Sequence, residues 1–103
     1  MTTLVVLFNL KPGVSAEQYE AWARAVDLPT VRKLPSVAEF QVYRAGSLLG
    51  SSEAAPYQYI EVIRLHDLQA LFADIGTPVM QKVASEFQAV ADAPQFIVCN
   101  ALV

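Results

Sequence analysis

The sequence has very little of what marks several common functional classes. It contains one cysteine, Cys99, and one histidine, His66, among 103 residues. A single cysteine excludes an intramolecular disulfide and a cysteine-rich metal site, and a single histidine excludes a multi-histidine metal site. Seven Lys and Arg residues are scattered along a chain of net charge -3, so no nucleic-acid partner is expected. The sequence also carries no glycine-rich phosphate-binding loop and no nucleophile motif.

The sequence is rich in hydrophobic residues. Hydrophobic residues make up 54% and charged residues 17% of it, which excludes a disordered protein. Two separate cores do not fit in this length, so residues 1–103 are predicted to form one domain. The first apolar stretch has no basic segment before it and ends at Lys11-Pro12-Gly13, too short to cross a bilayer. We therefore expect a soluble cytoplasmic protein with no membrane insertion.

The hydrophobic pattern predicts alternating strands and helices. Ser15 and Gln18 form a capping box at the first helix start, and Asp67 and the Thr77-Pro78 pair begin two more helical segments. Pro29 disfavours helix at the preceding residue, so the first helix is expected to break near Asp27. The predicted strands cover residues 3–10, 37–45, 57–65 and 95–102. This βαββαβ order predicts an α+β, ferredoxin-like fold: an antiparallel four-stranded sheet with strands one and three central and the helices on one face.

The first strand is apolar on both faces, because Val5 and Leu7 alternate with Leu4, Val6 and Phe8. Helices on one face would leave the other face bare, as a larger apolar patch than a soluble monomer usually exposes. The simplest cover is a second copy, sheet against sheet. The sequence therefore predicts a homodimer in which the two sheets form a shared, dimeric α/β barrel.

Two side chains are candidates for catalysis. His66, at a strand-to-helix junction, is either a general base or an exposed histidine beside a helix start. Asp27 lies near Arg24, Arg32 and Lys33. This group is either the polar mouth of a ligand site, with Asp27 as acid–base group or acceptor, or a surface ion-pair cluster.

Aromatic residues offer a second candidate region. Tyr43, Tyr57, Tyr59 and Glu61 have the same parity in their strands, which predicts one shared sheet face. That face is either a polar pocket floor or a wet dimer interface, and the interface is slightly favoured. Trp22 is either part of the core or a platform for a ligand.

The sequence resembles a known family. The opening LVVLFNLKPGVS is similar to the first strand and turn of dimeric α/β-barrel proteins. Three further stretches, YEAWARAVDLPTVRKLPSV, PYQYIEVI and MQKVASEFQA, more specifically resemble the RedY-like, or HapK, family of prodigiosin-type pigment pathways, over nearly the whole chain. The resemblance implies a small cytoplasmic dimer that takes part in making the methoxy-bipyrrole aldehyde half of the pigment, in a reaction that is poorly defined for the family.

Polyketide cyclases of the same superfamily look similar in strands one and three, but they carry histidines where this chain has Leu4, Gln58, Thr77 and Met80, and only Pro78 of their last-helix motif is retained. A histidine-based cyclase mechanism is therefore not expected. In the haem-binding branches an axial histidine is required, and His66 at a helix start is not the expected placement. We expect no haem, metal or other cofactor.

The leading hypothesis is a biosynthetic protein that binds a flat, apolar, pyrrolic or other heteroaromatic ligand between sheet and helices and acts on it or shields it. A non-catalytic carrier dimer and a cofactor-free monooxygenase or cyclase are the alternatives, and whether the protein is an enzyme is left open. The candidate catalytic residues are Asp27 and His66, and the candidate ligand-binding residues are Trp22, Arg32, Gln58 and Tyr59.

Overall fold

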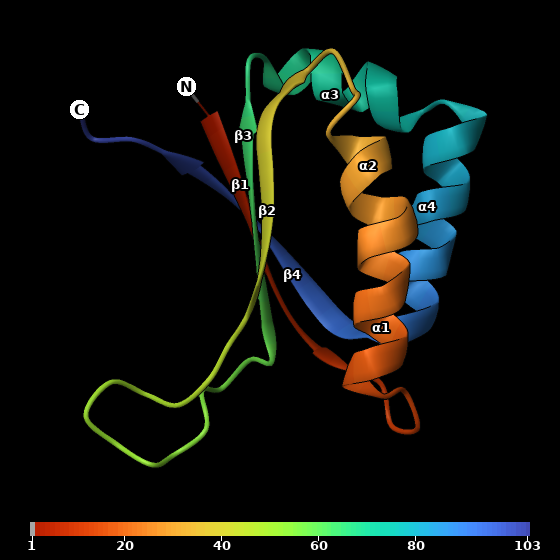
Figure 1. The fold of residues 1–103 in the computed structure, drawn as a ribbon. Coiled ribbons are helices and arrows are strands. Elements are labelled where there is room, and N and C mark those ends of the chain that lie inside the picture. The colour runs from red at the N-terminus through yellow and green to blue at the C-terminus, as the bar shows by residue number, and fades with distance from the viewer. Residues whose placement is uncertain (1) are drawn as a thin grey trace.

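The computed structural model describes residues 2–103 as a four-stranded antiparallel sheet with helices against one face (Figure 1). The sheet order is β2-β3-β1-β4, so the predicted βαββαβ topology with strands one and three central is confirmed. The strands are β1 (Thr2–Leu10), β2 (Val37–Arg44), β3 (Tyr59–Leu65) and β4 (Ala91–Asn100), and the helical segments are α1 (Ala16–Trp22), η1 (Ala23–Asp27), α2 (Leu28–Val31), α3 (Leu68–Ile75) and α4 (Pro78–Val90).

The helix starts follow from their caps. The Asp67 carboxylate accepts hydrogen bonds from the first turn of α3, and Thr77 Oγ1 accepts one from the Met80 N–H of α4, so both predicted caps are confirmed. Ser15 Oγ accepts the Gln18 N–H at 3.1 Å. No reciprocal bond from the Gln18 side chain is found within residues 2–103, so only half of the predicted capping box forms.

The predicted helix break near Asp27 is wrong. Leu28 has helical dihedral angles, φ -58° and ψ -52°, and the chain stays helical from Ala16 to Val31. The segment η1 is a π-helical turn, in which the Leu28 N–H bonds to the Ala23 carbonyl five residues back. A wider turn leaves room for the proline ring. It also lets the helix continue although Pro29 has no backbone N–H to donate.

The core lies between the sheet and the helices. Phe8 is fully buried at its centre and packs its ring against those of Tyr19, Tyr59 and Phe87, with centroid distances of 5.4, 5.6 and 4.9 Å. These aromatic contacts join β1, β3, α1 and α4, and they fix how the first helix lies over the sheet.

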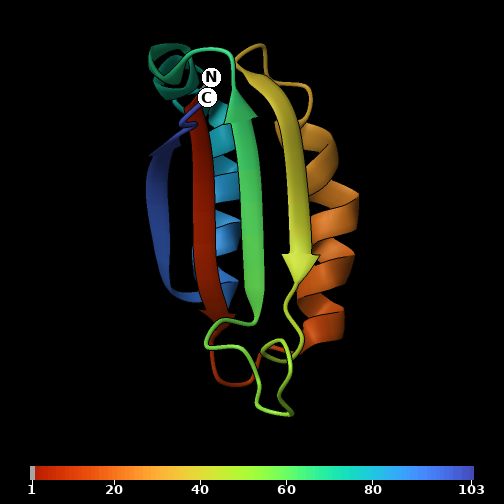
Figure 2. The same ribbon diagram turned by 90° about the vertical axis from the view of Figure 1, so that its left-hand side faces the viewer.

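The other sheet face carries no helix (Figure 2). Val5 pairs with Val62 and with Ile97, and Leu7 pairs with Ile60, so apolar side chains line this open face as the alternation predicts. Ile97 is 41% exposed. The segment between β2 and β3 and the chain after β4 both extend toward the open-face side (Figure 1).

The shared face predicted for the tyrosines is wrong. In the β2–β3 register Tyr43 pairs with Ile60, so it lies on the open face, whereas Tyr59 and Glu61 lie on the helix side and are buried. Tyr57 precedes β3, and its hydroxyl donates to Gln95 Oε1 at 3.3 Å. Within one strand, the pleat fixes which residues share a face. Whether residues of two strands share a face depends on the pairing register of the strands, and the β2–β3 register shifts between Val37 and Glu39.

Within residues 2–103, no helix is long and apolar enough to cross a membrane.

Candidate functional site

The main cavity lies between the sheet and the helices and has a volume of about 260 Å³. This is just below the usual 300–1,000 Å³ of small-molecule sites, so it suits a ligand of one or two rings. Its lining is almost wholly apolar and comes from all four strands and from η1, α2, α3 and α4. The lining residues used below are Asp27, Val31, Glu61, Leu71, Ala84, Phe87, Gln88 and Phe96.

Two carboxyl groups line this apolar cavity, those of Asp27 and Glu61, which we call the carboxyl pair. Each residue is only 5% exposed. Asp27 comes from the π-helical turn. Because that turn is wider than an α-turn, residues four apart stay on one face, and Tyr19, Ala23, Asp27 and Val31 are all buried.

Asp27 has no polar partner within the described part of the chain. The neighbouring arginines are engaged elsewhere: Arg24 pairs with Glu20 at 3.3 Å, and Arg32 Nε donates to the Phe40 carbonyl at 3.0 Å. The surface ion-pair interpretation of the Asp27 region therefore does not hold for Asp27 itself. A buried polar group without a partner is costly, which makes this carboxyl a candidate for ligand contact.

Glu61 has one partner, the Tyr19 hydroxyl, which donates to its Oε2 at 3.3 Å. Burial raises the pKa of Asp27 from 3.8 to about 7. Burial, and then the neighbouring charge of Asp27, raises the pKa of Glu61 from 4.5 to about 8, against the opposing effect of the Tyr19 hydrogen bond. Two such carboxyls titrate as a pair, and they hold at least one proton near neutral pH.

The structure brings only one of the predicted site residues, Asp27, to the cavity. His66 is exposed at the turn between β3 and α3, and its backbone N–H donates to the Ser36 carbonyl. Arg32 lies outside the lining. Gln58 Oε1 accepts the Leu10 N–H at 2.6 Å and so ties the end of β1 to the chain before β3.

The two predicted aromatic site residues lie next to the cavity lining. Trp22 is half-buried, donates from Nε1 to Glu86 at 2.9 Å, and stacks on Phe87, which does line the cavity. Tyr59 lines a smaller pocket of about 120 Å³ together with Tyr19, and another of about 190 Å³ together with Gln58.

Glu61 is the site residue that sequence reasoning missed. Its strand parity placed it with the tyrosines on a face interpreted as either a polar pocket floor or a wet dimer interface, and it was not among the candidate catalytic or ligand-binding residues. A usable signal was present: Glu61 interrupts an apolar run in a central strand, where an unpaired carboxylate is seldom buried without a reason.

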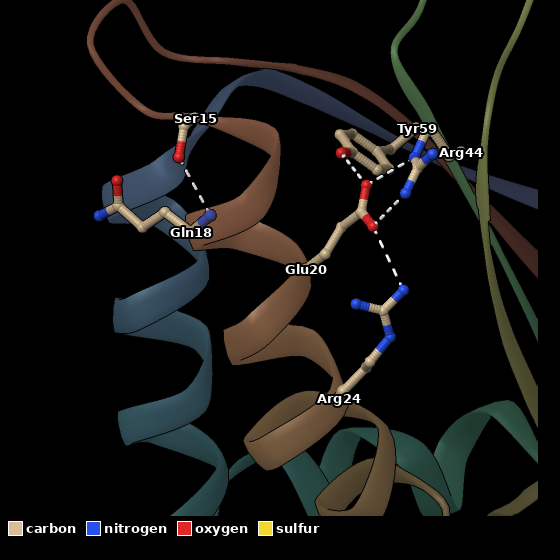
Figure 3. A network of polar contacts seen from close by, with 6 residues as sticks. All are labelled: Ser15, Gln18, Glu20, Arg24, Arg44 and Tyr59. Atoms are coloured by element: carbon tan, nitrogen blue, oxygen red, sulfur yellow. Dashed lines mark hydrogen bonds and ion pairs between the residues drawn. The ribbon is translucent and has the colours of Figure 1, made fainter.

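The smaller pocket has a polar network at its rim (Figure 3). The Glu20 carboxylate accepts from Arg44 Nε at 2.7 Å and from the Tyr59 hydroxyl at 2.7 Å, and it also pairs with Arg24. The hydrogen bonds from Arg44, followed by that from Tyr59, lower the pKa of Glu20 to about 2. The network joins α1 to the ends of β2 and β3.

The variant Glu20→Gln is expected to have a modestly lower melting temperature than the wild type above pH 5, because it loses ion pairs that water already screens. The difference should shrink as the pH falls from about 4.5 toward 2 and vanish below pH 2, where the wild-type carboxylate is protonated as well. Thermal unfolding followed by circular dichroism measures this. A difference that stays constant down to pH 2 would contradict it.

Within residues 2–103, no group of three or more His, Cys, Asp or Glu side chains is placed to hold a metal ion. Asp27 and Glu61 supply two carboxyl groups, and no third His, Cys, Asp or Glu side chain of the described residues joins them to form such a group.

These features define a ferredoxin-like α+β protein with a buried apolar cavity that contains two carboxyl groups. The chain belongs to the family of the REDY-like protein HapK, whose sequence pattern matches residues 2–102. No protein with a curated description matches it in sequence.

Solved structures place the same fold in several organisms. HapK from Hahella chejuensis is 33% identical, with a TM-score of 0.81 over 99% of this chain and 93% of that chain. SnoaB from Streptomyces nogalater, described as a cofactor-independent oxygenase, is 17% identical, with a TM-score of 0.71 over 99% and 93%. A dimeric protein of unknown function from Bacteroides fragilis is 12% identical, with a TM-score of 0.66 over 97% and 95%. The last two show the fold alone.

Proposed function

We propose that this protein serves a prodigiosin-type pigment pathway in the cytoplasm, where it binds a flat bipyrrole or related heteroaromatic intermediate in the main cavity and acts on it or shields it. The observation that carries the proposal is the unpartnered, buried carboxyl of Asp27 in an otherwise apolar cavity of about 260 Å³. Membership of the REDY-like HapK family supports the biosynthetic role.

The chemistry of such a ligand matches this lining. A bipyrrole is planar and mostly apolar, so the aliphatic and aromatic side chains around it gain from excluding water. Its pyrrole N–H is a hydrogen-bond donor that would otherwise be buried without a partner. Asp27 offers an acceptor at the cavity wall, and a hydrogen bond to a charged acceptor is stronger than one between neutral groups.

The test is to fill the cavity without disturbing the rest of the fold. Ala84 and Ala89 are both exposed positions of α4, but only Ala84 lines the cavity, so Ala84→Phe adds a ring where it can obstruct the cavity and Ala89→Phe adds the same ring outside the lining. Ala84→Phe is expected to weaken binding of a bipyrrole carbaldehyde at least tenfold, while Ala89→Phe binds as the wild type does. Calorimetric titration measures both.

Melting temperatures of the two variants show whether each is folded. Equal binding by both folded variants would place the ligand outside the main cavity and would overturn the proposal. Failure of the wild type to bind any bipyrrole carbaldehyde would do the same.

We also propose that the protein is a homodimer that buries the open face of the sheet of each copy. Without a partner, Val5, Leu7, Ile60, Val62 and Ile97 would form a continuous apolar surface in water. The segment between β2 and β3 extends past this face and carries the exposed side chains of Leu48 and Leu49. A sheet-to-sheet arrangement would give these segments a surface to contact.

A further inference from the structure

The carboxyl pair is unusual because no positively charged side chain of residues 2–103 lines its cavity. Both residues are 5% exposed and line one cavity, and no arginine, lysine or histidine lines that cavity with them. A buried pair of like charges is strongly unfavourable, so one carboxyl keeps its proton or a ligand supplies a positive charge. These two outcomes predict different classes of ligand.

We infer that the carboxyl pair works as one recognition element, in which one carboxyl donates and the other accepts, and that it selects an uncharged ring compound whose N–H donor and carbonyl acceptor lie side by side. This inference rests on the proposed function, because it specifies what the cavity recognises. The residue added to the site is Glu61, with Tyr19 as its positioning residue.

The singly protonated pair has the right hydrogen-bonding groups for such a ligand. The carboxylate accepts the ring N–H, and the neutral carboxyl donates its O–H to the carbonyl. Both hydrogen bonds form without adding net charge to the cavity. A cationic ligand would instead favour ionisation of the second carboxyl as well, within a lining that offers no polar side chain other than Gln88 to solvate that additional charge.

The groups that face the pair are few. Tyr19 of α1 donates to Glu61, and its own pKa is raised by burial and by the neighbouring carboxyls. The lining contributed by β1, β2, β4, α2, α3 and α4 contains no titratable side chain among the described residues. Changes in ligand binding between pH 6 and 9 therefore report on the carboxyl pair.

The experiment uses the whole protein and pyrrole carbaldehyde, with the aldehyde on the carbon next to nitrogen so that its N–H and carbonyl lie side by side. 2-Methylpyrrole, which keeps the ring N–H but lacks the carbonyl acceptor, is the matched ligand. Binding is followed by calorimetry and by fluorescence of Trp22, which stacks on the lining residue Phe87. The wild type is expected to prefer the carbaldehyde by about tenfold at pH 6, since 2-methylpyrrole cannot accept the hydrogen bond that the neutral carboxyl donates to the carbonyl. The preference should decline by pH 9.

Two variants at position 61 separate recognition from structure. Glu61→Gln keeps a neutral donor beside an ionised Asp27, so it should retain the preference for the carbaldehyde and hold it unchanged to pH 9. Glu61→Leu keeps the volume approximately and removes the donor to the carbonyl, so the preference for the carbaldehyde should drop by about tenfold. Glu17→Gln removes an exposed carboxyl in the first turn of α1, outside the cavity lining, and should behave as the wild type does.

Several results would overturn the inference. One is equal affinity of the wild type for the two pyrrole compounds, and another is an unchanged preference in folded Glu61→Leu. A third is tighter binding of a protonated aminomethylpyrrole as the pH rises, which would show a cation site. If Ala84→Phe blocks binding while the variants at position 61 bind with wild-type preference, the cavity function stands and the role of Glu61 fails. If Ala84→Phe has no effect, the proposed function fails first.

Discussion

Raising the pH from about 4 to 8 is expected to destabilise the folded protein by on the order of 4 kcal/mol. The cause is the carboxyl pair. In the folded state, burial raises the pKa of Asp27 to about 7 and that of Glu61 to about 8, whereas 3.8 and 4.5 are the ordinary values that apply once the chain unfolds. Between these limits the folded state holds more protons than the unfolded state, so removing protons favours unfolding.

The magnitude follows from the size of the pKa shift. One pKa unit corresponds to about 1.4 kcal/mol, and Asp27 alone moves by roughly three units. In a chain of this length, 1 kcal/mol changes the melting temperature by about 4–8 °C. The melting temperature should therefore fall by more than about 10 °C between pH 5 and 8. Below pH 4 the opposite effect of Glu20 takes over, since its carboxylate is stabilised only while ionised.

Asp27→Asn removes one of the two titrating groups and should flatten this slope, so the variant is expected to be more stable than the wild type at pH 8. The measurement is urea unfolding at a series of pH values. Glu17→Gln serves as the control, because Glu17 is exposed in the first turn of α1, away from the open face of the sheet, and should leave the slope unchanged. A wild-type melting temperature that does not change from pH 5 to 8 would show that both carboxyls ionise freely and that water fills the cavity.

The features predicted correctly from the sequence are those set by neighbouring residues. Asp67 and Thr77 define helix starts through bonds to the next few backbone N–H groups, and the βαββαβ order fixes which strands are central. The alternation in β1 depends only on the pleat, so the apolar open face was also predictable. The resemblance to the RedY-like family was confirmed over residues 2–102.

The features that were missed depend on contacts between distant segments. Pro29 disfavours an ordinary helix, but a π-helical turn accommodates it, and that turn is what faces Asp27 into the cavity. The β2–β3 register separates Tyr43 from Tyr59, which no single strand reveals. Glu61 lies 34 residues after Asp27, about a third of the chain length, so neither its sequence neighbours nor its strand parity indicated the pair. The functional roles of His66 and Asp27 stay predictions.

Replacing one valine on the open face is expected to dissociate the dimer. Wild-type protein at micromolar concentration should sediment at about twice the chain mass of 11.3 kDa. Val62 is half-buried in the central strand β3, where it pairs with Val5. In a two-fold symmetric interface each substitution occurs twice, so Val62→Asp would bury two unpaired carboxylates against an apolar surface. We expect this to raise the dissociation constant more than about a hundredfold.

The matched control is Val79→Asp, because Val79 is 62% exposed on α4, on the helix side of the sheet. This variant should still sediment as a dimer. Circular dichroism of Val62→Asp must show the wild-type strand and helix content, so that loss of the dimer is distinguished from unfolding. If the wild-type protein sediments as a monomer, the proposed dimer is excluded and the apolar open face is left unexplained. A folded Val62→Asp variant that stays dimeric would instead move the interface off this face, and the exposed segment around Leu48 and Leu49 would then be the next surface to test.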